Sequence, residues 1–214
     1  MAASHREWSS ATLLAYRRSM IRLERPHIRF HRSYLEAHDE FGGAKRDGDG
    51  VWVEAADGKD YPGISFTHDE MDTPEGFERY VRWRLNSSRE DAPRGSGHVP
   101  STFFWIAEDA HPHTYLGSIS VRHRLTQFLL DVGGHIGYSV RPSARRRGVA
   151  TEALRLVLPH AAGLGIDPAL VTCDVDNVGS ARVIEANGGV LEDVRGVKKR
   201  YWVPTTSRRP ADLS

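Results

Sequence analysis

The sequence predicts a mixed α/β fold in which one sheet carries helices on its faces. Apolar runs of strand length occur at residues 103–107, 115–121 and 134–140, after a helical first half. From residue 147 onward, helical and strand patterns alternate along the chain. The apolar fraction of 39% and charged fraction of 27% are ordinary for a globular domain that buries a core.

The domain itself is expected to span residues 20–203. Residues 1–19 are interpreted as an extension, either disordered or forming an amphipathic helix over residues 10–21. The stretch from Ile21 to Pro26 is interpreted as the opening strand of the domain, and the alternative is a helix that packs on the core or on a partner. The polar residues 204–214 are predicted to form a flexible tail.

Two helices are predicted in the first half of the domain. The first runs from Ser33 to Phe41, with Ser33 as N-cap and Glu36 completing a capping box. The second opens at Thr73, where a proline and an acidic residue follow the capping threonine. The stretches 42–63 and 87–97 are expected to be loops, the former with a short strand at 51–53.

The second half contains the clearest periodicity. A helix is expected over residues 147–162 because its apolar residues recur at helical spacing. A shorter helix at 179–186 ends at an Asn-Gly-Gly sequence. The remaining predicted strands cover residues 170–175, 190–194 and 200–203.

Charge and cysteine content exclude several functions. The net charge of +1 does not favour nucleic-acid or membrane binding, and no apolar run is long enough to span a bilayer. A single cysteine, Cys173, fits a reducing compartment, so a cytoplasmic location is expected. Asp174 and Asp176 lack further nearby ligands, and the histidines are scattered, so no metal site is expected.

The segment most informative about chemistry begins where the third strand ends. An arginine-rich turn, Arg145 to Arg147, precedes Gly148 and the start of a helix. A helix N-terminus presents unpaired backbone N–H groups and a positive dipole, which suit a pyrophosphate. Gly148 would let the backbone approach the phosphates closely. The alternative interpretation is a solvated basic turn.

The spacing Arg145-x-x-Gly148-x-Ala150 resembles the pyrophosphate-binding signature of the GNAT acetyltransferases. A second segment, Asn177-x-x-Ser180, resembles a later motif of the same family. The resemblance covers residues 100–203. It implies a mostly antiparallel sheet of about six to seven strands, splayed between strands four and five and flanked by about four helices.

The resemblance also implies a set of residues that bind acetyl-CoA. Backbone groups at the splayed strand, the arginine-rich turn, the following helix start and the second motif would contact it. These are Tyr138, Ser139, Val140, Arg145, Arg146, Arg147, Gly148, Val149, Ala150, Thr151, Asn177 and Ser180.

Acetyl transfer to an amine requires a base, because an ammonium has no lone pair. Many family members place a glutamate where this chain has His135, so His135 is the first candidate, followed by His123 and Asp131. Each could instead be an ordinary strand or loop residue. The family's usual tyrosine acid is replaced by Ile184, which cannot donate a proton.

The predicted function is therefore transfer of the acetyl group of acetyl-CoA to a primary amine of a small molecule. Two alternatives remain: a protein N-terminal or lysine acetyltransferase, and a non-catalytic module that binds acyl-CoA. The expected partners are acetyl-CoA and an amine acceptor. The oligomeric state is left open, with a homodimer as one alternative, since dimers are common in this family.

Overall fold

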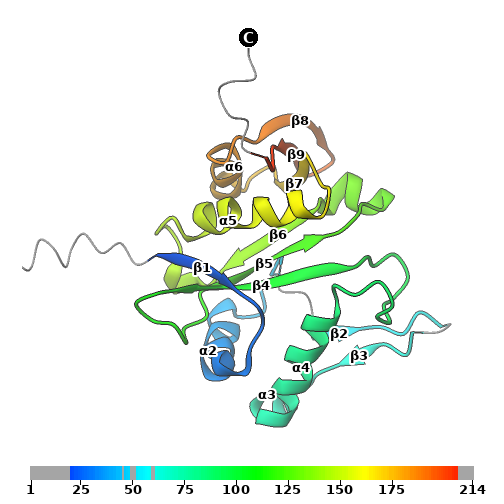
Figure 1. Ribbon diagram of the computed structural model, residues 1–214, viewed down its shortest axis with the longest axis vertical. Coiled ribbons are helices and arrows are strands. Elements are labelled where there is room, and N and C mark those ends of the chain that lie inside the picture. The colour runs from blue at the N-terminus through cyan, green and yellow to red at the C-terminus, as the bar shows by residue number, and fades with distance from the viewer. Residues whose placement is uncertain (1–19, 45, 49–51, 59–60, 207–214) are drawn as a thin grey trace, which may run out of the picture.

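The computed structural model describes residues 20–206 apart from residues 45, 49–51 and 59–60. Its centre is a seven-stranded sheet in the order β1-β4-β5-β6-β7-β9-β8 (Figure 1). The strands are β1 (Ile21–Glu24), β4 (Ser101–Glu108), β5 (Gly117–Arg122), β6 (Ile136–Val140), β7 (Ala169–Asp174), β8 (Val190–Arg195) and β9 (Lys198–Val203). A separate two-stranded sheet pairs β2 (Val53–Glu54) with β3 (Ile64–Ser65).

The central sheet is antiparallel except between β6 and β7, its fourth and fifth strands in spatial order. These two parallel strands share the single residue pair Ile136–Val171, and beyond it they diverge. The predicted mixed sheet and its splay are thereby confirmed. The opening leaves backbone of β6 available to a ligand.

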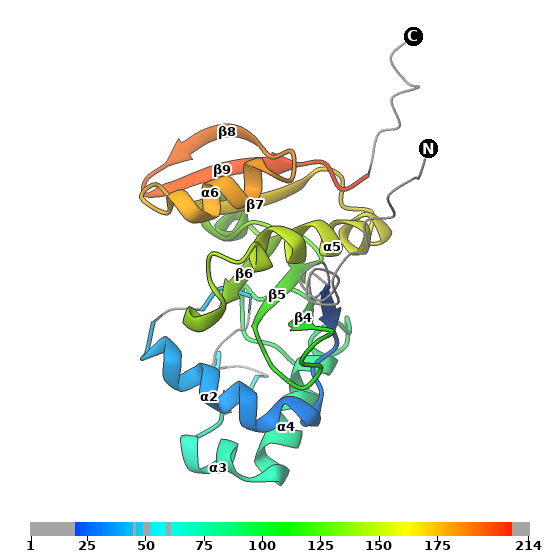
Figure 2. The same cartoon turned by 90° about the vertical axis from the view of Figure 1, so that its left-hand side faces the viewer.

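Helices cover both faces of the sheet (Figure 2). The helices α5 (Val149–Gly163) and α6 (Val178–Glu185) lie on one face, called here the α5 face. The helices α2 (His31–Phe41) and α4 (Pro74–Asn86) lie on the other, called the α2 face. Each face buries its own apolar cluster, and the predicted helices of the second half are confirmed to within two residues at each end.

The alternation of β5 explains why the two faces differ. Ile119 and Val121 point into the apolar cluster of the α5 face. Ser118 and Ser120 alternate with them and therefore point toward the α2 face. Across the sheet, Ser120 pairs with Gly137 of β6. Small side chains on adjacent strands leave space between the sheet and α2.

The start of α2 differs from the prediction. A short 3-10 turn, Ile28–Phe30, leads directly into the helix, so its N-cap is Phe30, without a side-chain hydrogen bond. Ser33 lies inside the helix, where its Oγ accepts the Tyr115 N–H at 3.0 Å. Because Tyr115 lies just before β5, the Ser33 side chain links α2 to the sheet rather than capping the helix.

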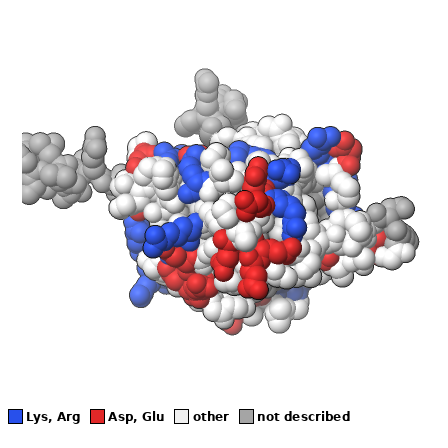
Figure 3. All heavy atoms as spheres, turned by 90° about the horizontal axis from the view of Figure 1, so that it is seen from below, with Lys and Arg blue, Asp and Glu red and all other residues white. Residues whose placement is uncertain are grey.

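A capping box does occur, but at a helix that the sequence analysis missed. Thr67 caps α3 (His68–Asp72), and Glu70 bonds back to the Thr67 N–H. The predicted Thr73 cap of α4 is confirmed, because its Oγ accepts from the Gly76 N–H at 3.0 Å. Acidic residues in the first turns of both helices complement the helix dipoles. Acidic atoms gather on the face of the molecule seen from below (Figure 3).

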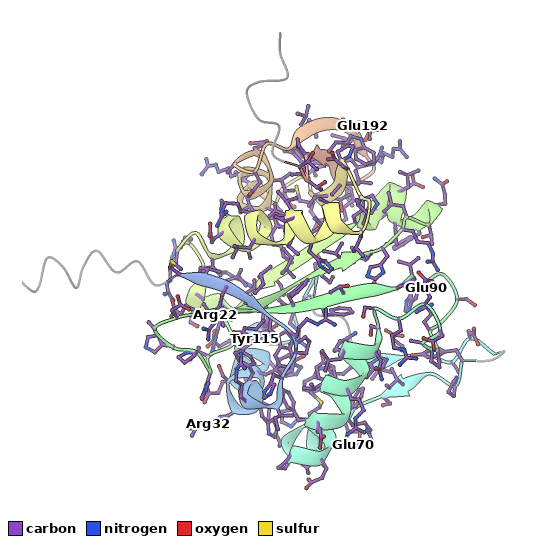
Figure 4. The ribbon with its side chains drawn as sticks, viewed as in Figure 1. Arg22, Arg32, Glu70, Glu90, Tyr115 and Glu192 are labelled. Atoms are coloured by element: carbon purple, nitrogen blue, oxygen red, sulfur yellow. The ribbon has the colours of Figure 1, made fainter. Side chains whose placement is uncertain are left out.

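The core of the α2 face is aromatic. Tyr115 lies between α2 and the sheet (Figure 4), with its ring centroid 5.0 Å from that of Tyr34 and 5.7 Å from that of Trp105. Tyr34 in turn shares a 2.8 Å hydrogen bond with the Tyr80 hydroxyl of α4. This network fixes α2 and α4 against β4, and thus fixes the wall above the small residues of β5.

The C-terminal end of the described chain packs against the domain at Thr205. Thr205, inside the predicted flexible segment, is buried and donates its hydroxyl hydrogen to the Ile166 carbonyl at 2.6 Å. The Asp167 carboxylate accepts the Thr205 N–H. Residues 1–19 and 207–214, with the predicted N-terminal helix, lie outside the described residues. Within the described part of the chain, no helix combines the length and apolarity needed to cross a bilayer.

Candidate active site

A cavity of about 850 Å³ occupies the opening between β6 and β7. Strand β6 contributes residues 136–140 to its wall, and β7 contributes residues 172–174. The N-terminal turns of α5 and α6 close the side that belongs to the α5 face. Ligand pockets of several hundred cubic ångströms are the usual size for small molecules and cofactors.

The turn before α5 has a backbone arranged for an anion. Gly148 is the N-cap, with φ +80°, and no side chain caps the first N–H groups of the helix. Arg146 also adopts a positive φ of 59°, which is uncommon outside glycine. The uncapped N–H groups and the helix dipole therefore face the cavity as an anion-binding end. A diphosphate bridge such as that of CoA fits this end.

The sequence-predicted cofactor residues converge on this cavity, with one exception. Its lining includes Tyr138, Ser139, Val140, Arg145, Arg146, Gly148, Val149, Ala150, Thr151, Asn177 and Ser180. Arg147 instead points to the buried Glu108, with a 2.8 Å ion pair from its Nη2. Arg147 therefore braces the turn from behind, while Arg145 and Arg146 remain beside the cavity.

Two hydroxyl groups meet across the cavity wall. The Tyr138 hydroxyl of β6 lies 2.7 Å from Ser180 Oγ on α6. Burial is the main reason that the pKa of Tyr138 is raised. Ser180 is held in place because the Asn177 Oδ1 accepts its backbone N–H at 2.9 Å. Ile184, at the position of the usual tyrosine acid, is fully buried.

An ion pair ties the anion-binding turn to α2. Arg141 follows β6 and is 7% exposed, and its Nε donates to Glu40 Oε1 at 3.0 Å. The Ser143 N–H donates to the other Glu40 oxygen at 3.1 Å. These partners lower the pKa of Glu40 to about 2, with the Arg141 hydrogen bond as the largest cause. Glu40 is thus a charged anchor between the two faces of the sheet.

A second cavity of about 460 Å³ lies on the α2 face. Its floor is formed by Ser101, Phe103, Ser120 and Arg122, and its wall includes the stacked rings of His38 and Trp52. Ring centroids of this pair are 3.9 Å apart. The space left by the small residues of β5 is therefore a real cavity with an aromatic wall.

The two cavities meet at Phe41, Asp47 and Arg122, which line both. Gly48 explains how Asp47 reaches this point. A Cβ at Gly48 would lie 2.3 Å from the Gly137 carbonyl oxygen, so the loop rests directly on β6. The Gly48 φ of +85° also favours glycine. The junction thus lies beside β6, on the side of the splay opposite α5.

The three predicted bases lie elsewhere. None of them is among the described residues that line either cavity. His123 Nε2 lies 2.9 Å from Thr102 Oγ1. Asp131 accepts from Gln127 at 2.9 Å and pairs with Arg195. His135 precedes β6 and is 8% exposed.

His135 has a structural partner that accounts for its position. The His135 Nδ1 accepts the backbone N–H of Leu170 at 2.9 Å, and the backbone N–H of His135 donates to the Leu170 carbonyl at 2.7 Å. Burial, followed by the charge of Arg122, lowers the pKa of His135 to about 4. The imidazole is therefore neutral at neutral pH, and it joins β7 to the start of β6.

The acidic residue at the end of β7 has a partner of its own. Asp174 forms an ion pair with Lys198, at 2.5 Å between Oδ1 and Nζ. Cys173 is buried, and burial raises the pKa of its thiol. Among the residues that the structure describes, no group of three or more His, Cys, Asp or Glu side chains is placed to hold a metal ion.

Sequence reasoning missed the junction residues Phe41, Asp47 and Arg122. Asp47 lies in a loop without periodicity, and its position depends on the contact of Gly48 with β6. A signal did exist for the cavity floor, because the Ser118–Val121 pattern alternates small polar with apolar residues. On a strand, that pattern predicts one face without bulky side chains.

The comparisons with known proteins decide the family. The family model described as an acetyltransferase (GNAT) domain matches residues 51–190, which include both motifs and the strands β5 and β6. The chain belongs to the GNAT acetyltransferase family. It is an acetyl-CoA-dependent acyltransferase. No curated protein matches the sequence.

Solved structures share the fold of this GNAT protein at low sequence identity. RimJ of Mycobacterium smegmatis, in complex with CoA-disulfide, has a TM-score of 0.54 and 15% identity, covering 86% of this chain and 80% of its own. The acetyltransferase MccE, in complex with acetyl-CoA and AMP, has a TM-score of 0.52 and 13% identity, covering 86% of this chain and 92% of its own. A ribosomal-protein-serine acetyltransferase described from Vibrio cholerae has a TM-score of 0.52 and 13% identity, covering 86% of this chain and 94% of its own.

Proposed function

We propose that this GNAT protein transfers the acetyl group of acetyl-CoA directly to the primary amine of a small molecule. The observation that carries the proposal is the junction of the two cavities beside β6. The larger cavity, between the splayed strands, suits the pantetheine and pyrophosphate. The smaller one, which is lined by residues of α2 and by residues 43, 44 and 46–48, would hold the acceptor amine.

In this proposal the anion-binding turn holds the diphosphate, with N–H groups of α5 and the side chains of Arg145 and Arg146. The thioester supplies the activated acetyl group. Backbone groups of β6 that the splay leaves without strand partners would orient its carbonyl. Tyr138 and Ser180 flank the same strand and would sit near the sulfur.

Asp47 is the proposed general base. It is the carboxylate at the junction of the two cavities. Asp47 would take a proton from the ammonium and pass it to solvent, and the freed nitrogen would attack the thioester carbon. As the carbon–sulfur bond breaks, the nitrogen would give its second proton to the Asp47 carboxylate, which leaves the neutral amide. The Tyr138 hydroxyl, bonded to Ser180, would then give a proton to the departing thiolate. This assignment replaces His135, His123 and Asp131 as the proposed base.

The test is a thiol-release assay with acetyl-CoA and a panel of amines and peptides, run on wild type, Asp47→Asn and Tyr138→Phe. We expect Asp47→Asn to lower kcat by about 10² to 10⁴, the usual contribution of a general base. Its affinity for CoA, measured by calorimetry, should stay unchanged. Tyr138→Phe should reduce kcat by a smaller factor, because a thiolate is a tolerable leaving group.

The same assay separates the alternatives. Full activity of Asp47→Asn would remove Asp47 as base. Thiol release with peptides but with no small amine would favour a protein acetyltransferase. Tight CoA binding without release on any acceptor would favour a binding module. His135→Asn serves as the matched variant, and we expect it to retain most of kcat.

A further inference from the structure

The smaller cavity has a charge pattern that a simple amine does not explain. Its described lining includes the guanidinium groups of Arg46 and Arg122 but one carboxylate, that of Asp47. Two guanidinium groups and one carboxylate therefore stand in the described lining. An acceptor such as a polyamine would bring more positive charge into this space, and like charges at short range repel.

Arg122 is the more informative of the two guanidinium groups. It ends β5 on the α2 face, and its Nη1 donates to the Gly133 and Gly134 carbonyls at 2.9 and 3.1 Å. Burial lowers the pKa of Arg122, and the nearby charge of Asp47 opposes this effect. The two carbonyls fix the direction of the guanidinium without neutralising it. A partly buried guanidinium that opens onto a cavity can bind an anionic group there by charge-assisted hydrogen bonds.

The positions of the groups define the ligand further. Both Nη atoms of Arg122 would lie 3.5 Å from a Cβ at Gly137, so the guanidinium reaches the middle of β6. Asp47 lies at the same junction. An amine at Asp47 and an anion at Arg122 would therefore belong to one small molecule, with few bonds between them.

Aromatic rings make up much of the remaining lining, beside Arg46 and two serines. Phe41 and Phe103 contribute rings, and the stacked His38–Trp52 pair forms the far wall. The floor at Ser120 is small enough to leave room for a side chain. Aromatic and aliphatic bodies pack well against such walls.

From these features we infer that the acceptor is a free amino acid with an apolar or aromatic side chain, its carboxylate bound by Arg122 and its amine directed to Asp47. The inference rests on the proposed function and names the substrate class of that site. Neutral amides, simple amines and peptide N-termini lack a carboxylate at this distance, and they are expected to be poorer acceptors.

The test compares phenylalanine, phenylalaninamide and phenethylamine, which share the aromatic body and differ in the anionic group. Rates of thiol release with acetyl-CoA give kcat/KM, and calorimetry on the CoA-loaded protein gives the dissociation constants. We expect phenylalanine to be favoured over its amide by at least about tenfold in both measurements, as for a hydrogen bond to a charged group. Equal or better performance of the amide, or of the dipeptide Phe-Ala, would overturn the inference.

The variant Arg122→Gln should abolish the preference for phenylalanine over phenylalaninamide, so that the two give about equal kcat/KM values. Its dissociation constant for CoA should stay within about twofold of the wild-type value. Arg122→Lys keeps the charge and should keep part of the preference. An unchanged preference in Arg122→Gln would overturn the inference. Should Arg122→Gln not fold, the wild-type series decides the question on its own. Selective binding of phenylalanine without thiol release would support the inferred ligand class and contradict the proposed transfer reaction. Failure of the ligand inference and failure of the proposed reaction therefore give different results.

Discussion

At the scale of single residues, the junction shows how side chains of similar chemistry take different roles. His135 and Asp47 are both able to accept a proton. His135 is fixed between β6 and β7 by two hydrogen bonds to the Leu170 backbone. Asp47 lies on a loop that rests on β6 and lines both cavities. Location, rather than residue type, therefore separates a structural group from a candidate base.

His135 should make the stability of the protein depend on pH. Its pKa falls from 6.5 to about 4 on folding, so between these values the unfolded chain binds more protons. Stability is therefore lost as the pH falls through this window, by about 2.5 kcal/mol at about pH 4.5. In His135→Asn, the amide oxygen can still accept the Leu170 N–H but does not titrate. Urea unfolding at about pH 7 and about pH 4.5 should show a smaller loss in the variant; equal losses would contradict this role.

At the scale of elements, the anion-binding turn and α5 act as one unit. Gly148 ends the turn and caps the helix, and a Cβ placed there would meet no protein atom within 4 Å. A substitution would therefore cost backbone strain in the free protein and would add steric conflict with a diphosphate when acetyl-CoA binds.

Gly165 provides a matched control for Gly148→Ala. It follows the other end of α5 with φ +77°, and a Cβ there also has nothing within 4 Å. Both alanine variants should lose about 1 kcal/mol of stability. Only Gly148→Ala should weaken acetyl-CoA binding, by about tenfold, as measured by calorimetry. Equal affinities in the two variants would show that the diphosphate lies elsewhere.

The sequence predicted the elements of the second half better than those of the first. Residues 147–162 show a helical period, and the structure places α5 at Val149–Gly163. Ser33 followed by Glu36 imitates a capping box, yet α2 begins at His31 because a 3-10 turn precedes it. Local patterns cannot reveal that the Ser33 hydroxyl is needed by the Tyr115 N–H, which is distant in sequence.

The candidate site was predictable in the same uneven way. Motif spacing located the residues of the larger cavity, since they come from contiguous turns at the starts of α5 and α6. The placement of Arg122 and Asp47 depends on how a loop packs on β6, which no short pattern encodes. Arg147 shares its local sequence context with Arg145 and Arg146, yet its side chain pairs with the buried Glu108, which is distant in sequence.

At the scale of the whole molecule, two joined cavities predict that both substrates bind before the reaction. Cys173 lines the larger cavity, but burial raises the pKa of its thiol, which disfavours the thiolate needed for an acyl-enzyme. Initial-rate measurements should therefore give intersecting double-reciprocal lines, and Cys173→Ala should retain most of kcat. Parallel lines with loss of activity in Cys173→Ala would indicate a covalent intermediate instead.

The ion pair between Glu40 and Arg141 has a consequence for cooperativity. Glu40 bonds to the segment before the anion-binding turn, and its neighbour Phe41 lines both cavities. A ligand that stiffens the turn would therefore also stiffen the wall of the smaller cavity, reducing the entropy that the second ligand must lose. Such coupling is reciprocal: whatever factor acetyl-CoA adds to acceptor affinity, the acceptor adds to the affinity for acetyl-CoA.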